Sequence, residues 1–172
     1  MTANVQPEGD SGMSAMKKRH ARQRLVSMVA GPLWVGLSVF VMRFWYRYRI
    51  ADVDGIRAQY RAIRAQSDAP MLICANHLTL VDSFLATWAL GSGVYWVTHP
   101  DELAWNTPES TNFGRTRRHR LAIFLAKCIP ITRGGAREEV AGVLDRVRHL
   151  LVNGETALIF PEAGRSRTGR VE

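Results

Sequence analysis

Cysteine is scarce in this chain, and the placement of its two cysteines argues against disulfide bonds and against cysteine-based metal sites. The 172 residues include two cysteines, Cys74 and Cys128, with no CxxC spacing between them. Both stand inside apolar segments, so we expect small buried thiols in a reducing compartment and no disulfide. No cluster of His and Cys has the spacing of metal ligands, so we expect neither a metal nor a resident cofactor.

A serine nucleophile motif is absent, and acidic residues are few. The chain has no Gly-x-Ser-x-Gly elbow, which argues against a serine nucleophile of that type. Acidic residues are outnumbered, with 15 Asp and Glu against 23 Lys and Arg, so the net charge is +8 and the pI is near 10.3. Such a charge indicates an anionic partner, either nucleic acid or anionic lipid. The placement of the basic residues has to decide between them.

That placement is typical of a membrane protein. A run without charged residues extends from Leu25 to Met42, at the lower edge of the length that crosses a bilayer as a helix. Gly31-Pro32 interrupts it, so a kinked segment in one leaflet, a true span and a buried core helix all remain open. We assign residues 16–49 to a membrane-anchoring helix or helical hairpin, and polar residues 1–15 to a disordered tail. The run is flanked on both sides by basic residues, which set no direction of insertion: Lys17, Lys18, Arg19, Arg22, Arg24, Arg43, Arg47 and Arg49.

Residues 50–172 alternate between short apolar runs and amphipathic stretches, which predicts an α/β domain with a mixed sheet covered by helices. The domain opens with a helix that carries Ile56, Tyr60 and Ile63 at helical spacing, and we expect this helix near a lipid surface. Strands are predicted over 71–75, 94–98, 129–132 and 157–160, and helices over 82–90, 121–128 and 138–152. The last helix places one apolar stripe before a stop at Gly154: Val140, Val143, Leu144, Val147, Leu150 and Leu151.

Two polar segments permit a functional and a structural interpretation. Residues 99–114 form a long loop that either lines a site or is a solvated connection. The basic cluster from Arg115 to Arg120 either meets phosphates or is a solvated face.

Two motifs carry the chemistry. The first is Asn76-His77-Leu78-Thr79-Leu80-Val81-Asp82, and the second is Phe160-Pro161-Glu162-Ala163-Gly164-Arg165-Ser166, each directly after a predicted strand. Positions five apart in a continuous helix lie roughly 140° from each other. His77 and Asp82 therefore meet only if His77 lies in the loop and Asp82 opens the next helix. A carboxylate that holds an imidazole fixes its tautomer and raises its basicity, as removal of an alcohol proton requires.

Together these motifs resemble those of the glycerolipid acyltransferase family, whose best-known members are the 1-acylglycerol-3-phosphate acyltransferases. The family pattern is Asn-His-x-x-x-x-Asp, a short strand ending in Arg, and Phe-Pro-Glu-Gly-Thr-Arg-Ser. The first block is complete at 76–82, the second corresponds to 129–134, and the third to 160–166. The family's Gly-Thr is Ala163-Gly164 here. Family members normally continue through further strands, so we expect the domain to be incomplete at its C-terminus.

The resemblance implies a direct transfer at a membrane. His77, oriented by Asp82, would take the proton from a hydroxyl of a lysophospholipid, and the acyl donor would be acyl-CoA or acyl-carrier protein. The expected acceptor is 1-acylglycerol-3-phosphate, which gives phosphatidic acid in phospholipid biosynthesis. We expect the catalytic domain on the cytoplasmic side of a bacterial inner membrane.

The same resemblance implies the binding residues. Arg133 and Arg165 would hold the acceptor's phosphate, because a planar guanidinium gives paired hydrogen bonds. Glu162 would bind the acceptor's polar part or order those arginines. A backbone N–H near Ala163 and Gly164 would stabilise the oxyanion of the tetrahedral intermediate.

Two other classes of protein remain as alternatives. The altered turn and the early end of the chain are also consistent with a non-catalytic, membrane-bound lipid-binding fragment. A nucleic-acid binder is disfavoured, because the basic residues flank an apolar segment and no recognised reader motif is present.

Overall fold

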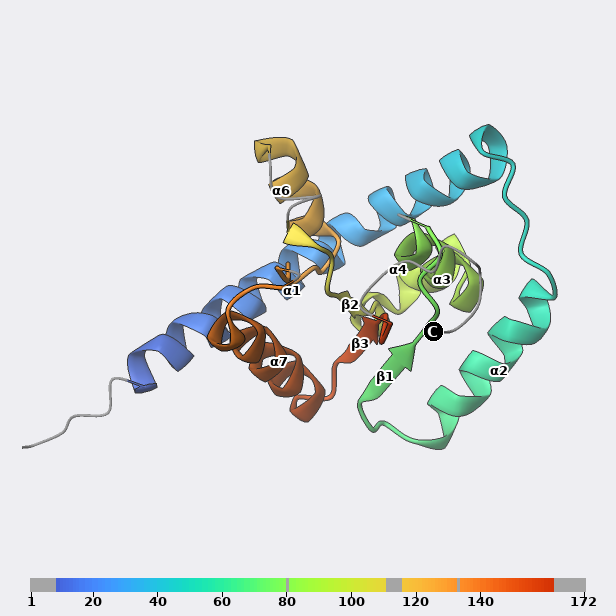
Figure 1. Ribbon diagram of the computed structural model, residues 1–172. Coiled ribbons are helices and arrows are strands. Elements are labelled where there is room, and N and C mark those ends of the chain that lie inside the picture. The colour runs from blue at the N-terminus through green and yellow to red at the C-terminus, as the bar shows by residue number, and fades with distance from the viewer. Residues whose placement is uncertain (1–8, 80, 111–115, 133, 163–172) are drawn as a thin grey trace, which may run out of the picture.

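The computed structural model describes residues 9–79, 81–110, 116–132 and 134–162 (Figure 1). The described elements follow one another in this order: α1 (Gly9–Phe40), the π-helix η1 (Val41–Trp45), α2 (Val53–Gln66), β1 (Met71–Cys74), α3 (Asp82–Leu90), α4 (Gly93–Thr98), the 3₁₀-helix η2 (Pro100–Glu102), β2 (Trp105–Asn106), α6 (Arg117–Leu125), α7 (Arg137–Val152) and β3 (Thr156–Ile159).

A small parallel sheet lies at the centre, in the order β1-β3-β2. Met71 of β1 is opposite Thr156 of β3, and Trp105 of β2 is opposite Ala157. The α/β class is confirmed, but the expected mixture of strand directions is wrong for the described strands, because both pairings are parallel. Parallel neighbours need long crossovers, and the helices between the strands supply them.

The predicted strand over 129–132 is reduced to isolated bridges. Asn106 pairs with Cys128 and Glu109 with Ile131, both in the parallel sense. Pro130 between them has no N–H to donate, so the ladder is interrupted there. The segment still runs beside β2 and extends the sheet beyond that strand.

The predicted loop over 99–114 contains a strand of this sheet. Trp105 in β2 is 1% exposed, and its indole Nε1 donates to Glu155 Oε2 at 3.1 Å. Leu103 and Trp105 are buried although the residues around them are polar. The interpretation of this segment as a solvated connection is therefore wrong for the part of it that the structure describes.

Helix α7 covers one face of the sheet. Val143, Val147 and Leu150 pack on Trp105 and on neighbouring apolar residues of the sheet. The helix ends at Val152, and Gly154 follows with φ of 80°, as the predicted stop requires. Leu144, placed on the buried stripe by its spacing, is exposed instead.

The segment over 94–98 is the helix α4 and not the predicted strand. Ser92 caps it by accepting a hydrogen bond from the Tyr95 N–H at 3.1 Å. Trp96 is buried beside Val35 of α1 and Tyr60 of α2, and its indole donates to the carbonyl of Thr87. The apolar run favoured a strand, but the cap and the buried Trp96 set a helical turn.

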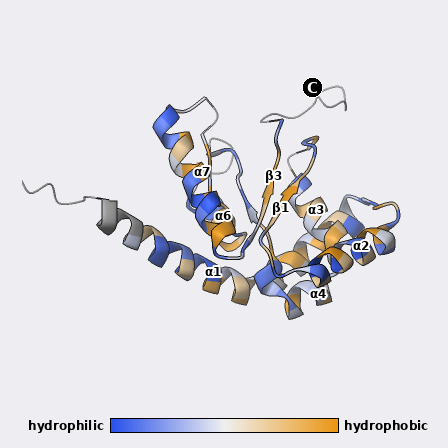
Figure 2. Ribbon diagram, turned by 90° about the horizontal axis from the view of Figure 1, so that it is seen from below, coloured by the Kyte–Doolittle hydropathy of each residue, from blue (hydrophilic) through white to orange (hydrophobic). Residues whose placement is uncertain are grey.

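Helix α1 contacts α3, α4 and α6 and lies at the end of the sheet where β3 begins (Figure 2). It starts at Gly9, so residues 9–15, expected in a disordered tail, are helical. No single helix in the described residues is long and apolar enough to cross a membrane, but 14–31 and 33–45, bent by 52°, meet the length and composition criteria together. The bend falls at Pro32, where the sequence predicted a kink.

Candidate active site

His77 and Asp82 meet as the motif requires. His77 lies in the loop after β1, and Asp82 is the first residue of α3. His77 Nδ1 lies 2.8 Å from Asp82 Oδ2, which is hydrogen-bonding distance. The imidazole is 21% exposed, so it is neither buried in the core nor free in solvent.

The Asp82 carboxylate organises the whole loop. Besides the His77 ring, its Oδ2 accepts from the N–H of Leu78 at 2.6 Å and of Thr79 at 2.7 Å, and its Oδ1 accepts from the Thr79 hydroxyl. Burial alone would raise the pKa of Asp82, but the hydrogen bonds from Thr79, His77 and Leu78 outweigh it and lower that pKa. Asp82 is therefore a carboxylate at neutral pH.

An anionic Asp82 settles the tautomer of the neutral imidazole. Since the carboxylate only accepts, the proton of His77 lies on Nδ1, and Nε2 carries the lone pair. No hydrogen bond to Nε2 occurs from any residue that the structure describes. This nitrogen is thus available to take a proton.

The imidazole rests on Phe160, the first residue of the second motif. The two ring centroids are 4.5 Å apart and the ring planes differ by 23°, a stacked arrangement. Sequence reasoning assigned Phe160 no role beyond its place in the motif, although its position directly after β3 indicated that it lies at the same edge as His77. The contact joins the two motifs, which are 83 residues apart (160 minus 77) in the chain.

The parallel sheet explains why the motifs converge. β1 and β3 are paired in the same direction, with Cys74 opposite Ile159, so the residues after both strands lie at one edge of the sheet. Glu162 lies in the turn after β3 and is partly exposed. Of the other expected binding residues, Arg133, Ala163, Gly164 and Arg165 lie outside the residues that the structure describes.

The two cysteines differ from each other. Cys128 is largely buried, and burial raises the pKa of its thiol to about 12. Cys74, expected to be buried as well, is exposed, because alternate residues of β1 point away from the core. Both are free thiols.

The family comparison agrees with this geometry. A model of the Acyltransferase family matches residues 58–171, two thirds of the chain and all three blocks of the motif pattern. No curated protein and no solved structure gives a significant match. In the part of the chain that the structure describes, no group of three His, Cys, Asp or Glu side chains is placed to hold a metal ion. The chain belongs to the acyltransferase family, as the glycerolipid acyltransferase motifs had indicated, and residues 58–171 form its acyltransferase domain.

Proposed function

We propose that this protein transfers a fatty acyl group from a thioester to the hydroxyl of a lysophospholipid, with 1-acylglycerol-3-phosphate as the acceptor and phosphatidic acid as the product. The donor is acyl-CoA or acyl-carrier protein. The observation that carries the proposal is the His77 ring, held by Asp82 on one side and stacked on Phe160, with Nε2 available.

In this mechanism His77 acts as a general base and then as a general acid. Nε2 takes the proton of the acceptor hydroxyl as the oxygen attacks the thioester carbonyl. The tetrahedral intermediate collapses with loss of the thiolate, which takes the proton back from Nε2. Asp82 stabilises the imidazolium in between, and no acyl-enzyme forms.

The binding roles rest on the family resemblance and on the parallel sheet. Arg133 and Arg165 hold the acceptor's phosphate, and Glu162 orders them or the glycerol. A backbone N–H near Ala163 and Gly164 stabilises the oxyanion. Support comes from the shared edge of β1 and β3, which brings the turn at 161–162 to the side of the sheet where His77 lies.

We further propose that α1 attaches the domain to a bilayer, with the catalytic domain on the cytoplasmic side. One face of α1 packs on the domain through Ser27 and Val35, and Met42 of η1 is buried as well. The opposite face is an apolar stripe at helical spacing, and each member is more than half exposed: Leu25, Val29, Leu33, Leu37, Phe40 and Phe44. A helix with one face on protein and one apolar face exposed supports attachment to one leaflet better than a span surrounded by lipid.

The test is acyl transfer from labelled acyl-CoA or acyl-carrier protein to a panel of lysophospholipids, with His77→Ala compared with His119→Ala. Both changes remove one imidazole, but His119 is exposed on α6 and belongs to none of the three motif blocks. We expect His77→Ala to lower the rate by about 10² to 10⁴, the usual contribution of a positioned base, and His119→Ala to leave it unchanged. Equal rates in the two variants would remove His77 from catalysis. A wild-type chain that binds lipid but forms no diacyl product would instead favour the non-catalytic lipid-binding alternative.

A further inference from the structure

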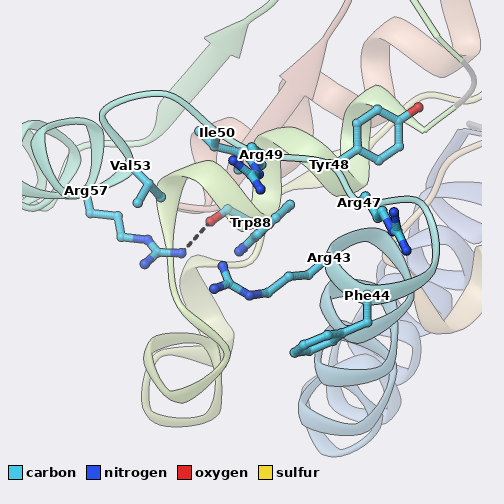
Figure 3. Close-up of a pocket in the computed structure, with 9 residues that line it drawn as sticks. All are labelled: Arg43, Phe44, Arg47, Tyr48, Arg49, Ile50, Val53, Arg57 and Trp88. Atoms are coloured by element: carbon cyan, nitrogen blue, oxygen red, sulfur yellow. Dashed lines mark hydrogen bonds between the residues drawn. The ribbon is translucent and has the colours of Figure 1, made fainter.

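An open pocket of about 500 Å³ lies where η1, the connection to α2, and helices α2 and α3 meet (Figure 3). Four of its lining residues are arginines: Arg43, Arg47, Arg49 and Arg57. Figure 3 shows Arg43 and Arg57 extending into it from opposite sides, one from η1 and the other from α2. The pocket thus concentrates positive charge that comes from separate elements.

These guanidinium groups have no carboxylate partner among the residues that the structure describes. The ion pairs of arginine found there are those of Arg24 with Glu155 and Arg64 with Glu102. Arg57 donates from Nη2 to the carbonyl of Trp88 at 2.9 Å, but its buried Nε has no acceptor. Unpaired guanidinium groups around one hollow are suited to a phosphate, which accepts paired, charge-assisted hydrogen bonds.

The pocket adjoins the apolar stripe. Phe44 both lines the pocket and ends the stripe, and its ring lies 4.9 Å from that of Phe40. Trp45 and Tyr46 beside it are 82% and 64% exposed, as aromatic rings at the headgroup level of a bilayer are. A ligand with a phosphate and acyl chains matches both surfaces, whereas a soluble nucleotide matches only the first.

The pocket is separate from the candidate active site. Trp88 lines it from the last turns of α3, while Asp82 opens that helix. Asp82 and Trp88 are six residues apart, which corresponds to about 9 Å along the helix axis. None of the lining residues belongs to the three motif blocks.

The backbone at Arg47 is a second sign of function. Arg47 has φ of 55°, in the left-handed region, where it ends η1 between the hydrogen bonds from Tyr46 N–H to Val41 and from Tyr48 N–H to Met42. Glycine is the residue that such a helix end favours. A bulky, charged residue there has a conformational cost, which a role in binding would explain.

We propose that this pocket binds the phosphate of an anionic phospholipid of the bilayer, and that it is a docking site distinct from the acceptor site. Arg43, Arg47, Arg49 and Arg57 supply the guanidinium groups, and Phe44 guides the acyl chains toward the stripe. The docking holds the η1 end of the anchor at the headgroup level of one leaflet.

The experiment measures binding of the full chain to phosphatidylcholine vesicles with and without phosphatidylglycerol. Arg43→Gln combined with Arg49→Gln is compared with Arg117→Gln combined with Arg118→Gln, two exposed arginines of α6. Both pairs remove the same charge, so both weaken the general attraction to anionic vesicles. The pocket pair is expected to lose at least about tenfold more affinity for these vesicles, since it also loses charge-assisted hydrogen bonds. Equal losses would overturn the proposal, because non-specific charge would then account for the binding.

Two further measurements distinguish lipid docking from misfolding of a variant and from binding of a soluble phosphate. Arg47→Gly is expected to weaken binding to anionic vesicles while it keeps or raises the midpoint of thermal unfolding; unchanged binding would remove Arg47 from the site.

Inorganic phosphate and CoA, each at matched ionic strength, are expected not to displace the chain from anionic vesicles. Displacement by either would assign the pocket to a soluble phosphate and overturn the lipid as its source. Binding to the neutral vesicles reports on the apolar stripe, and the acyl-transfer assay tests the active site separately.

Discussion

At the scale of single residues, Asp82 connects local structure with the proposed chemistry. Its carboxylate accepts hydrogen bonds from the His77 ring, from two backbone N–H groups and from the Thr79 hydroxyl. The same group that shapes the loop therefore also sets the tautomer of the imidazole. Loss of its charge should affect both stability and turnover, by amounts that can be measured separately.

Asp82→Asn is expected to lower kcat by about 10² to 10⁴, the range of general-base catalysis, because a neutral amide no longer stabilises the imidazolium. The KM of the acceptor should change much less, since Asp82 faces the imidazole and the loop. Steady-state kinetics with labelled acyl-CoA measures both quantities. Asp145→Asn, an exposed change on α7, is the matched control. A kcat equal to that of this control would contradict the assignment.

The stability of the chain should depend on pH through Asp82. The folded-state pKa of Asp82 lies below its ordinary value of 3.8, so its contribution is fully present above that value and is lost as the pH falls through the folded-state pKa. Asp82→Asn should therefore destabilise the fold by about 1–3 kcal/mol at pH 7, the cost of losing hydrogen bonds to a charged group. Denaturant unfolding at pH 7 and pH 3 should show a smaller difference between variant and wild type in acid. A difference that stays constant would contradict this linkage.

At the scale of elements, α1 is bound to the domain by polar groups as well as by packing. Gln23 donates to the carbonyls of Phe124 and Cys128, at 3.1 Å each, and Ser27 also donates to Phe124. The bonds to Phe124 satisfy a carbonyl in the last turn of α6, and the bond to Cys128 satisfies one in the segment that follows the helix. The apolar run of the sequence does not reveal this arrangement, since it depends on which face of α1 meets the domain.

A buried ion pair secures the same contact. Lys127 is fully buried, and its ammonium lies 3.1 Å from Glu155, which also pairs with Arg24 of α1. Burial lowers the pKa of Lys127, and the attraction of Glu155 opposes this. The Lys127 ammonium also lies 5.3 Å from the ring centroid of Trp105.

Glu155→Gln is expected to destabilise the protein by about 3 kcal/mol, at the lower end for a broken buried pair, because an amide oxygen still accepts one hydrogen bond. Glu138→Gln, on the exposed first turn of α7, should cost less than about 1 kcal/mol, mainly through the helix dipole. Denaturant unfolding of both variants checks the difference. Equal effects would show that Glu155 is not the counter-charge that stabilises Lys127.

The element predictions were most accurate for two helices, α3 and α7. Helix α3 has the predicted bounds, and α7 starts one residue earlier than expected. The predictions failed over 94–98 and 99–114, where tryptophans are buried by elements far away in the chain. A short apolar run is compatible with a helix or a strand, and here tertiary packing decided between them.

At the scale of the whole molecule, the sheet separates two regions. The strands lead to His77 and the Phe-Pro-Glu turn at one edge, while α1 lies near the start of β3, where Arg24 meets Glu155 (Figure 2). Helix α3 connects them, because it begins at Asp82 in the first region and its Phe84 packs edge to face on Trp34 of α1. The acyl-transfer chemistry and the proposed bilayer attachment are thereby assigned to different parts of one fold.

Replacing Leu33 and Leu37 with serine is expected to weaken binding to neutral vesicles by about tenfold or more, because each leucine gives up favourable burial in lipid. The fold should remain stable, since these side chains are 79% and 64% exposed. Leu144→Ser with Val152→Ser is the matched control on α7, because both side chains are exposed there as well. Vesicle co-sedimentation of the two double variants makes the comparison. Unchanged binding by the α1 variant would remove the stripe from the membrane contact.

The sequence by itself determined the family, the α/β class and the pairing of His77 with Asp82, because ordered motifs after apolar strands are local features. It also predicted the bend at Pro32, which follows from the geometry of proline. Only the tertiary structure decided that Phe160 supports His77, that Cys74 is exposed and that the strands run in parallel. These features depend on contacts between segments far apart in the chain, and the spacing of residues along one segment carries no record of them.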